Sequence, residues 1–208
     1  MSSFDWDEYW RIREEPEDAR EFAVKMADRV ATFTSNKRIE SVADFGCGPA
    51  SMLFELAERF PHVTFHGFDT ALSVVEMNRA KVAQNRFSNL HFIQDQLPRP
   101  QTGKIFDLVI CLSTLHYIRD IGIAVQNLFS RVCSGGYLLF NYPNIFSRAM
   151  YRRDIQSEDE CMKSRFALVL LGANLLSFRR IAYLLGVWPR KFYASIRGNI
   201  YVIVRKPS

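Results

Sequence analysis

From residue 41 to residue 142, short apolar runs alternate with segments whose apolar residues recur at helical spacing. Strands are predicted at 41–45, 63–68, 90–94, 106–112 and 137–142. Helices are predicted after the first, second and fourth of these strands, and Gly135-Gly136 is expected to end the last of the three. Strands that alternate with helices form βαβ units, in which a parallel sheet is covered on both faces. The pattern therefore predicts an α/β fold.

Three further segments flank or interrupt this pattern. Near the N-terminus, Phe22, Met26, Val30 and Phe33 form one stripe of a predicted helix. Two β-rich runs, 191–197 and 200–205, close the chain on either side of Gly198-Asn199, which is a two-residue hairpin signal. We expect a single domain over 1–208, with an N-terminal helical cap at 1–40 and an insertion at 144–177.

Charge is distributed unevenly along the 208 residues. The net charge is +5, but residues 1–144 carry a balance of −3 and residues 145–208 a balance of +8. A basic C-terminal third suits an anionic partner, and solvated arginines on helix faces explain it equally well.

The four cysteines lie far apart and form no CxxC pair, which favours reduced thiols and no metal site. The N-terminus lacks the basic and apolar regions of a signal peptide. The longest apolar stretch, 166–176, is too short to span a bilayer, so we expect no stable membrane insertion and a cytoplasmic location.

A glycine-bearing turn follows the first predicted strand, in the run Asp44-Phe45-Gly46-Cys47-Gly48. Glycines there allow a ligand to approach the backbone closely. Asp44 would repel a pyrophosphate but can pair with the ammonium of an amino-acid moiety. Ser51 occupies the place of the third glycine of a dinucleotide fingerprint, so NAD fits less well. Asp69 ends the second strand, where a carboxylate can accept hydrogen bonds from ribose hydroxyls.

These residues resemble the first motif and the ribose-binding acid of the class I methyltransferases that use S-adenosylmethionine (SAM). The similarity is greatest to the type 11/12-like branch, which includes ubiquinone- and menaquinone-biosynthesis enzymes. Ala50 stands where a third small residue is usual. The runs 106–120 and 135–139 resemble the fourth- and fifth-strand motifs of that branch. The resemblance implies a Rossmann-like, doubly wound, mostly parallel seven-stranded sheet with a C-terminal antiparallel hairpin.

The resemblance also implies SAM as cofactor, S-adenosylhomocysteine (SAH) as its product, and a set of cofactor-binding residues. Asp95 matches the acid beside the adenine amino group. The full set is Asp44, Gly46, Gly48, Asp69, Thr70, Asp95, Gln96 and Leu112. A strand-end aspartate often caps the next helix, so Asp69 has a structural role to weigh beside the cofactor role.

Methyl transfer from a sulfonium needs alignment of the acceptor and exclusion of water, and needs a base only where the acceptor must lose a proton. His116, just past the fourth strand, is the candidate catalytic base; capping of the next helix is an equal alternative. Candidate substrate residues lie near the N-terminus and around the fourth and fifth strands. They are Tyr9, Trp10, Arg11, Tyr117, Tyr142, Asn144 and Arg148.

The leading hypothesis is a methyltransferase for a small-molecule acceptor that is anionic, lipid-like or glycan-linked. The apolar stretch 166–176 fits a greasy pocket, a membrane surface or a core helix. The basic C-terminal third supports a second hypothesis, methylation of tRNA or another RNA. A third hypothesis is a regulatory protein that binds SAM without catalysis.

Overall fold

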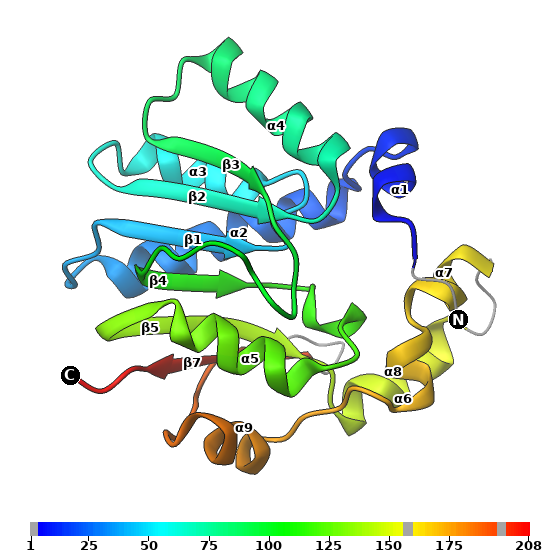
Figure 1. The fold of residues 1–208 in the computed structure, drawn as a ribbon. Helices are drawn as coiled ribbons and strands as arrows, with labels where there is room; N and C mark the ends of the chain where they lie inside the picture. The colour runs from blue at the N-terminus through cyan, green and yellow to red at the C-terminus, as the bar shows by residue number, and fades with distance from the viewer. Residues whose placement is uncertain (1–3, 156–159, 195–198) are drawn as a thin grey trace.

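The computed structural model describes residues 4–155, 160–194 and 199–208, and its centre is a seven-stranded sheet (Figure 1). The strand order is β3-β2-β1-β4-β5-β7-β6. The strands are β1 (Ser41–Phe45), β2 (Thr64–Asp69), β3 (Leu90–Gln94), β4 (Phe106–Cys111), β5 (Val132–Tyr142), β6 (Arg190–Ala194) and β7 (Ile200–Arg205). Strands β1 to β5 pair in parallel, whereas β7 is antiparallel to both β5 and β6. This arrangement confirms the predicted sheet with its C-terminal hairpin.

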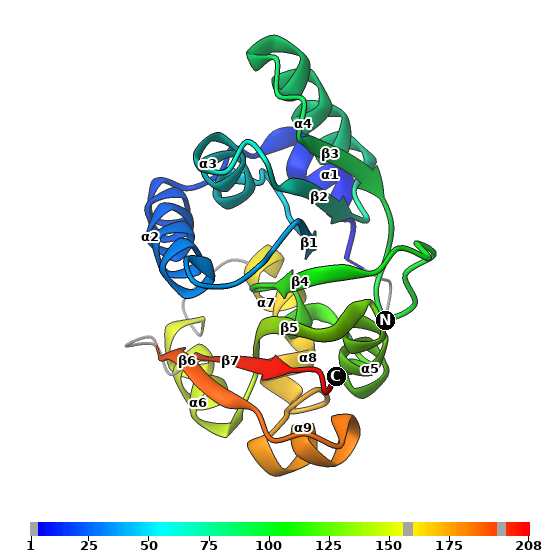
Figure 2. The same cartoon turned by 90° about the vertical axis from the view of Figure 1, so that its left-hand side faces the viewer.

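Helices cover both faces of the sheet. In Figure 2, α2 and α3 lie on one side and α5 on the other. The helices are α1 (Trp6–Ile12), α2 (Glu17–Thr34), α3 (Ser51–Arg59), α4 (Leu72–Asn85), the 3₁₀ turn η1 (Leu115–Tyr117), α5 (Ile121–Ser130), α6 (Ile145–Asp154), α7 (Glu160–Arg165), α8 (Ala167–Leu171) and α9 (Phe178–Leu185).

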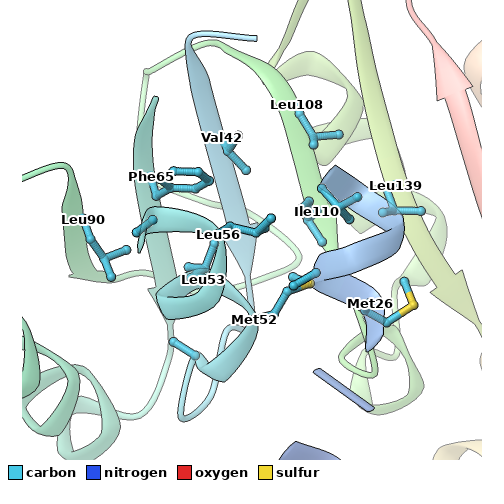
Figure 3. Close-up of a cluster of buried hydrophobic side chains, with 14 of the residues drawn as sticks. Met26, Val42, Met52, Leu53, Leu56, Phe65, Leu90, Leu108, Ile110 and Leu139 are labelled. Carbon is cyan, nitrogen blue, oxygen red and sulfur yellow. The ribbon is translucent and has the colours of Figure 1, made fainter. Parts of the chain in front are cut away.

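Two apolar clusters hold the layers together, because successive residues of a strand point to opposite faces. Val42 packs with Met26 of α2 and Leu53 of α3 in the first cluster, which Figure 3 shows. Ala43, the next residue of β1, packs with the second cluster, which includes Val125 of α5. The helical stripe predicted near the N-terminus is therefore confirmed as a core-facing helix.

The strand register brings the functional turn and the second strand end together. Phe45, the last residue of β1, pairs with Phe68, so Asp69 lies one residue beyond that pair. Asp69 in turn pairs with Gln94, the last residue of β3. The carboxyl ends of β1, β2 and β3 thus lie side by side, at the edge where ligands bind in open α/β sheets.

The glycine pair at 135–136 differs from its prediction. It was expected to end a helix, but α5 ends at Ser130 and both glycines lie inside β5. The β4–β5 register shifts there: a Cβ on Gly136 would lie 2.7 Å from the carbonyl oxygen of Asp107, and Gly135 has a φ of +78°. The glycines therefore permit an irregular strand, which local periodicity did not reveal. Gly198, from the predicted hairpin turn, lies outside the described residues.

Helix α1 and helix α7 of the insertion lie beyond the carboxyl ends of β2 and β4, as Figure 1 shows. Helix α1 packs against α4, and α8 packs against η1. The stretch 166–176 contains only one short helix, α8, followed by a turn at Gly172. No helix in the described part of the chain has the length and apolar character needed to cross a membrane.

Candidate active site

A cavity of about 1200 Å³ opens at the carboxyl ends of the parallel strands. Its wall is formed by α1, the turn after β1, the ends of β2, β3 and β4, and residues of η1, α7 and α8. All eight residues predicted to bind the cofactor line this cavity, although they come from four separate strand ends. The fold therefore brings together residues that are spread over nearly 70 positions of the sequence.

The glycine turn is held in a left-handed conformation by its surroundings. Gly46 and Gly48 have φ angles of +76° and +51°, which favour glycine. A Cβ on Gly46 would meet Thr114 Oγ1 at 2.1 Å, so no larger residue fits without rearrangement. Asn78, fully buried in α4, donates to the carbonyl oxygen of Gly48 at 2.7 Å. These contacts keep the turn open toward the cavity.

Asp69 links the turn to the start of α4. Its Oδ2 accepts a hydrogen bond from the N–H of Gly48, and its Oδ1 accepts one from the N–H of Ala71. Burial raises the pKa of Asp69, and the backbone donors Ala71, Gly48 and Thr70 oppose that rise. Asp69 therefore holds the backbone before α4 but does not cap the helix, because the N-cap is Ala71 and no side chain caps α4. Each carboxylate oxygen retains a lone pair for a ligand hydroxyl.

Asp44 is the buried acid without a partner. It is 5% exposed, and its Oδ1 has no hydrogen bond. Burial, together with the charge of Asp69, raises the pKa of Asp44 to about 8. A buried acceptor left unpaired is costly, and a cation bound in the cavity would remove that cost.

Asp95 closes the third strand end in a different way. Its carboxylate accepts hydrogen bonds from the N–H groups of Gln96, Gln101 and Thr102, which shape the loop after β3. The acid therefore stands at a fixed position on the cavity wall. Thr70 and Leu112 complete the lining on either side of the glycine turn.

An aromatic wall faces the acids. Trp10 covers the turn, since a Cβ on Gly48 would lie 3.3 Å from its ring. Tyr9 packs edge-on to Trp10, and Trp6 packs against Tyr117 with 4.6 Å between ring centroids. Helix α1 is fixed by Asp7, which accepts a hydrogen bond from the N–H of Ser73 at 2.7 Å. The N-terminal helix thus forms part of the cavity wall.

A family model described as a methyltransferase domain matches residues 36–189, which is most of the chain. The protein belongs to this methyltransferase family. The match confirms the family resemblance that the motifs indicate.

Individual relatives are similar over shorter stretches. A malonyl-[acyl-carrier protein] O-methyltransferase from Bacillus anthracis is 27% identical over 135 residues, covering 61% of this chain and 49% of its own length. A trans-aconitate 2-methyltransferase from Paracidovorax citrulli is 29% identical over 105 residues, covering 50% and 38%. The chain therefore spans about half or less of the curated relatives it matches.

Solved methyltransferase structures share the fold. The magnesium protoporphyrin IX methyltransferase from Synechocystis PCC 6803 with bound SAH aligns with a TM-score of 0.69. The alignment covers 97% of this chain and 92% of that chain at 18% sequence identity.

Of the predicted substrate residues of this chain, the structure brings Tyr9, Trp10 and Tyr117 to the cavity. The other four lie elsewhere, and each has a structural contact. Arg11 is exposed and pairs with Asp7 at 3.0 Å. Tyr142 is buried in the second cluster, and Asn144 caps α6 through the N–H groups of Phe146 and Ser147.

Arg148, the fourth of these residues, packs within the insertion and is not among the described residues that line the cavity. Its Nε donates to the carbonyl oxygen of Leu170 at 3.1 Å, and its guanidinium lies against Gly172. The insertion instead contributes Ser164, Arg165, Ala167 and Leu168 to the cavity wall. Sequence position alone could not show that Arg165 lines the cavity and Arg148 does not.

His116, the predicted base, does not line the cavity. Its side chain is 2% exposed, and its Nε2 lies 3.4 Å from Oδ1 of Asn199. Burial lowers the pKa of His116 to about 4. The adjacent residue Tyr117 points to the cavity instead, so the 3₁₀ turn decides which side chain is presented. A catalytic role for His116 stays a prediction.

Sequence reasoning missed several residues that build this site. Asn78 lies on the same helical face as Val74 and Val75, and a polar residue on a buried stripe was an available signal. Trp6 and Arg165 carried no comparable signal, because tertiary packing alone brings them to the cavity. In the described ranges, no three His, Cys, Asp or Glu residues are grouped to hold a metal ion.

Proposed function

We propose that this protein binds SAM in the cavity at the strand ends and transfers its methyl group to a small-molecule acceptor. One observation carries the proposal: the buried, unpartnered oxygen of Asp44 lies beside Asp69 and an open glycine turn. Such a site favours a ligand with both a cationic group and hydroxyl donors, and SAM has both.

The chain's own residues divide the binding work. Asp44 would hold the cationic amino-acid end, and Asp69 would accept hydrogen bonds from the ribose hydroxyls. Asp95 would face the adenine amino group, with Thr70, Gln96 and Leu112 around the nucleoside. When bound, SAM supplies a methyl group on a sulfonium, which is an activated leaving group.

The aromatic wall would do the remaining work of catalysis. Trp10, Tyr9 and Tyr117 exclude water from the cavity and offer flat faces against which an acceptor can be oriented. Placing the acceptor in line behind the methyl carbon is the largest contribution a protein can make to such a displacement.

The charge of the cavity supports a small acceptor over RNA. Among the described residues, seven acidic ones line it and only two cationic ones, Arg119 and Arg165. A polyanionic backbone would be repelled from such a lining. The named relatives also act on a carrier-bound malonyl group and on trans-aconitate, which are small acceptors.

Calorimetry with SAM and SAH tests the proposal directly. We expect both to bind the wild-type protein and to bind Asp44→Ala at least about tenfold more weakly, since a buried charge pair would be lost. Incubation with methyl-labelled SAM and fractionated cell extract would then separate an enzyme from a SAM-binding regulatory protein. Absence of SAM and SAH binding would contradict the assignment.

A further inference from the structure

Arg165, the last residue of α7, is half-buried at the wall of the cavity. Its guanidinium carbon lies within 5.5 Å of four aromatic ring centroids, at 4.9 Å from Tyr9, 5.2 Å from Tyr117, and 5.4 Å from both Trp6 and Phe166. Stacking of this kind holds a guanidinium in a fixed plane. The four rings come from α1, η1 and the α7–α8 junction, so the arginine stands where three segments meet.

The guanidinium is only partly satisfied by its neighbours. Nη1 donates to the hydroxyl of Tyr9 at 2.7 Å, and Nε donates to the hydroxyl of Tyr117 at 3.0 Å. Arginine has five N–H donors, and both acceptors here are neutral phenols. Among the ion pairs of the described residues, none includes Arg165. A half-buried cation is therefore left without a counter-ion.

Asp5 and Asp7, the acids at the start of α1 that line the cavity, are already engaged with other groups. Asp5 accepts hydrogen bonds from the N–H groups of Asp7 and Glu8 at the start of the helix. Asp7 pairs with Arg11 and binds Ser73. These two acids thus do not neutralise Arg165, and its remaining donors are available to an anion in the cavity.

A second observation is that the described residues lining the cavity include no histidine. His116 lies outside the lining. Tyr117 lines the cavity, but burial raises its pKa above the usual range, and it accepts a hydrogen bond from Arg165. An acceptor that arrives already ionised needs no base.

We propose that Arg165 binds the carboxylate of the methyl acceptor, so that the acceptor is a carboxylic acid and the product its methyl ester. This inference rests on the proposed methyl transfer. A carboxylate oxygen would form the new C–O bond with its own electron pair, and the electron pair of the broken C–S bond would stay on sulfur. No proton moves in this step, and a sulfonium and a carboxylate become a thioether and a neutral ester. The planar fork of arginine matches carboxylate geometry.

A purely structural role for Arg165, as a clasp between α1 and η1, makes a different prediction. A clasp accounts for the two phenol hydrogen bonds but not for an unpaired charge facing the cavity. Its removal would lower stability and weaken SAH and acceptor binding together. Removal of an acceptor-binding residue would leave SAH affinity unchanged and alter acceptor binding alone.

The experiment uses the full chain with SAH and a panel of aliphatic and aromatic carboxylic acids, each beside its primary amide and its phosphonate. Calorimetry first measures SAH binding, whose failure would count against the proposed function rather than against Arg165. Titration of the SAH complex then measures panel binding. We expect acids to bind, phosphonates to bind more weakly because their second charge meets an acidic lining, and amides not to bind.

Three variants complete the design. Arg165→Gln should weaken acid binding at least about tenfold without changing SAH affinity, because a charge-assisted pair is lost. Arg165→Lys should restore part of the affinity for acids. Arg180→Gln is the matched control, since Arg180 also stacks on a tyrosine, at 5.2 Å from Tyr183, but does not line the cavity.

Turnover gives a second readout. Acids that bind should accept labelled methyl as an ester, which alkali releases as methanol, and Arg165→Gln should raise KM more than it lowers kcat. The proposal is overturned if SAH binds but no acid does, if amides or phosphonates bind as well as acids, or if Arg165→Gln binds acids normally.

Discussion

Oδ2 of Asp69 accepts a hydrogen bond at 2.9 Å from the N–H of Gly48, which ties the end of β2 to the glycine turn after β1. The other oxygen of the same carboxylate binds the N–H of Ala71 at 3.0 Å, just before α4 begins. A single side chain thus shapes the proposed cofactor site and supports the adjacent helix. Binding and stability are therefore expected to change together when it is altered.

Asp69→Ala should weaken SAM binding sharply and also lower the free energy of unfolding. Loss of the carboxylate leaves two buried N–H groups without acceptors, and each unsatisfied group lowers the free energy of unfolding by about 1–3 kcal/mol. Calorimetry with SAM and urea unfolding measure the two effects. Asp120→Ala, at an exposed position where the side chain makes no capping bond, is the control. Unchanged SAM affinity in Asp69→Ala would show that this carboxylate only organises the backbone.

Asp44 should make SAM binding dependent on pH. Its pKa of about 8 in the ligand-free protein means that the acid is mostly protonated at pH 7, whereas a bound cation favours the ionised form. Binding then releases a proton. Below pH 8, SAM affinity should rise with pH by up to about tenfold per pH unit. Above about pH 8 it should level off.

Calorimetry of SAM binding to wild type and Asp44→Asn, from below pH 7 to above pH 8, measures this pH dependence. Asparagine resembles the protonated acid in shape but cannot ionise, so the variant should bind weakly and lack the Asp44-dependent part of the proton release. An identical pH dependence in both proteins would assign the titration to another group.

The sequence predicted the sheet, and also the strand-end residues that line the cavity, because both depend on local signals. The strand runs at 41–45 and 90–94 match β1 and β3 residue for residue. Asp44 and Asp69 lie at the carboxyl ends of β1 and β2, and the glycine turn and Asp95 directly follow β1 and β3. Parallel strands carry such residues to one edge. The parallel order of the strands then brings these residues together.

The acceptor side could not be predicted in the same way. Tyr117 and His116 are neighbours in a 3₁₀ turn, and only the turn geometry decides that Tyr117 faces the cavity. Arg148 and Arg165 both belong to the insertion, yet only Arg165 lines the cavity. Such choices depend on contacts between segments distant in sequence, which periodicity does not encode.

Asn174 shows how one polar residue in an apolar stretch can be structural. Its Nδ2 donates to the carbonyl oxygens of Leu115, His116 and Ile118 at 2.8 to 3.2 Å, and the residue is 1% exposed. Asn174→Leu should lower the free energy of unfolding by about 2–4 kcal/mol, because buried carbonyls of η1 lose their donor. Urea unfolding measures this, with the exposed Leu171→Ala as control. A change below about 0.5 kcal/mol would mean that water replaces the amide.

The catalytic role predicted for His116 can be tested apart from its structural role. If His116 acts as a base, His116→Gln should lower kcat at every pH above about 5, since its pKa of about 4 keeps the wild-type imidazole neutral there. SAM affinity should be unchanged. A wild-type kcat in this variant would exclude His116 as the catalytic base. That result would agree with the position of His116 outside the cavity lining.

His116 should also make the fold sensitive to acid. Burial lowers its pKa to about 4 from 6.5, so protons bind the unfolded chain more tightly than the native state. Its contribution to stability is complete above pH 6.5 and is lost as pH falls toward 4. Between pH 7 and pH 5 the wild type should lose about 2 kcal/mol more stability than His116→Gln, as measured by urea unfolding. His62→Gln, at an exposed position, should keep the wild-type pH dependence. Parallel curves for wild type and His116→Gln would show that folding does not lower the pKa of this imidazole.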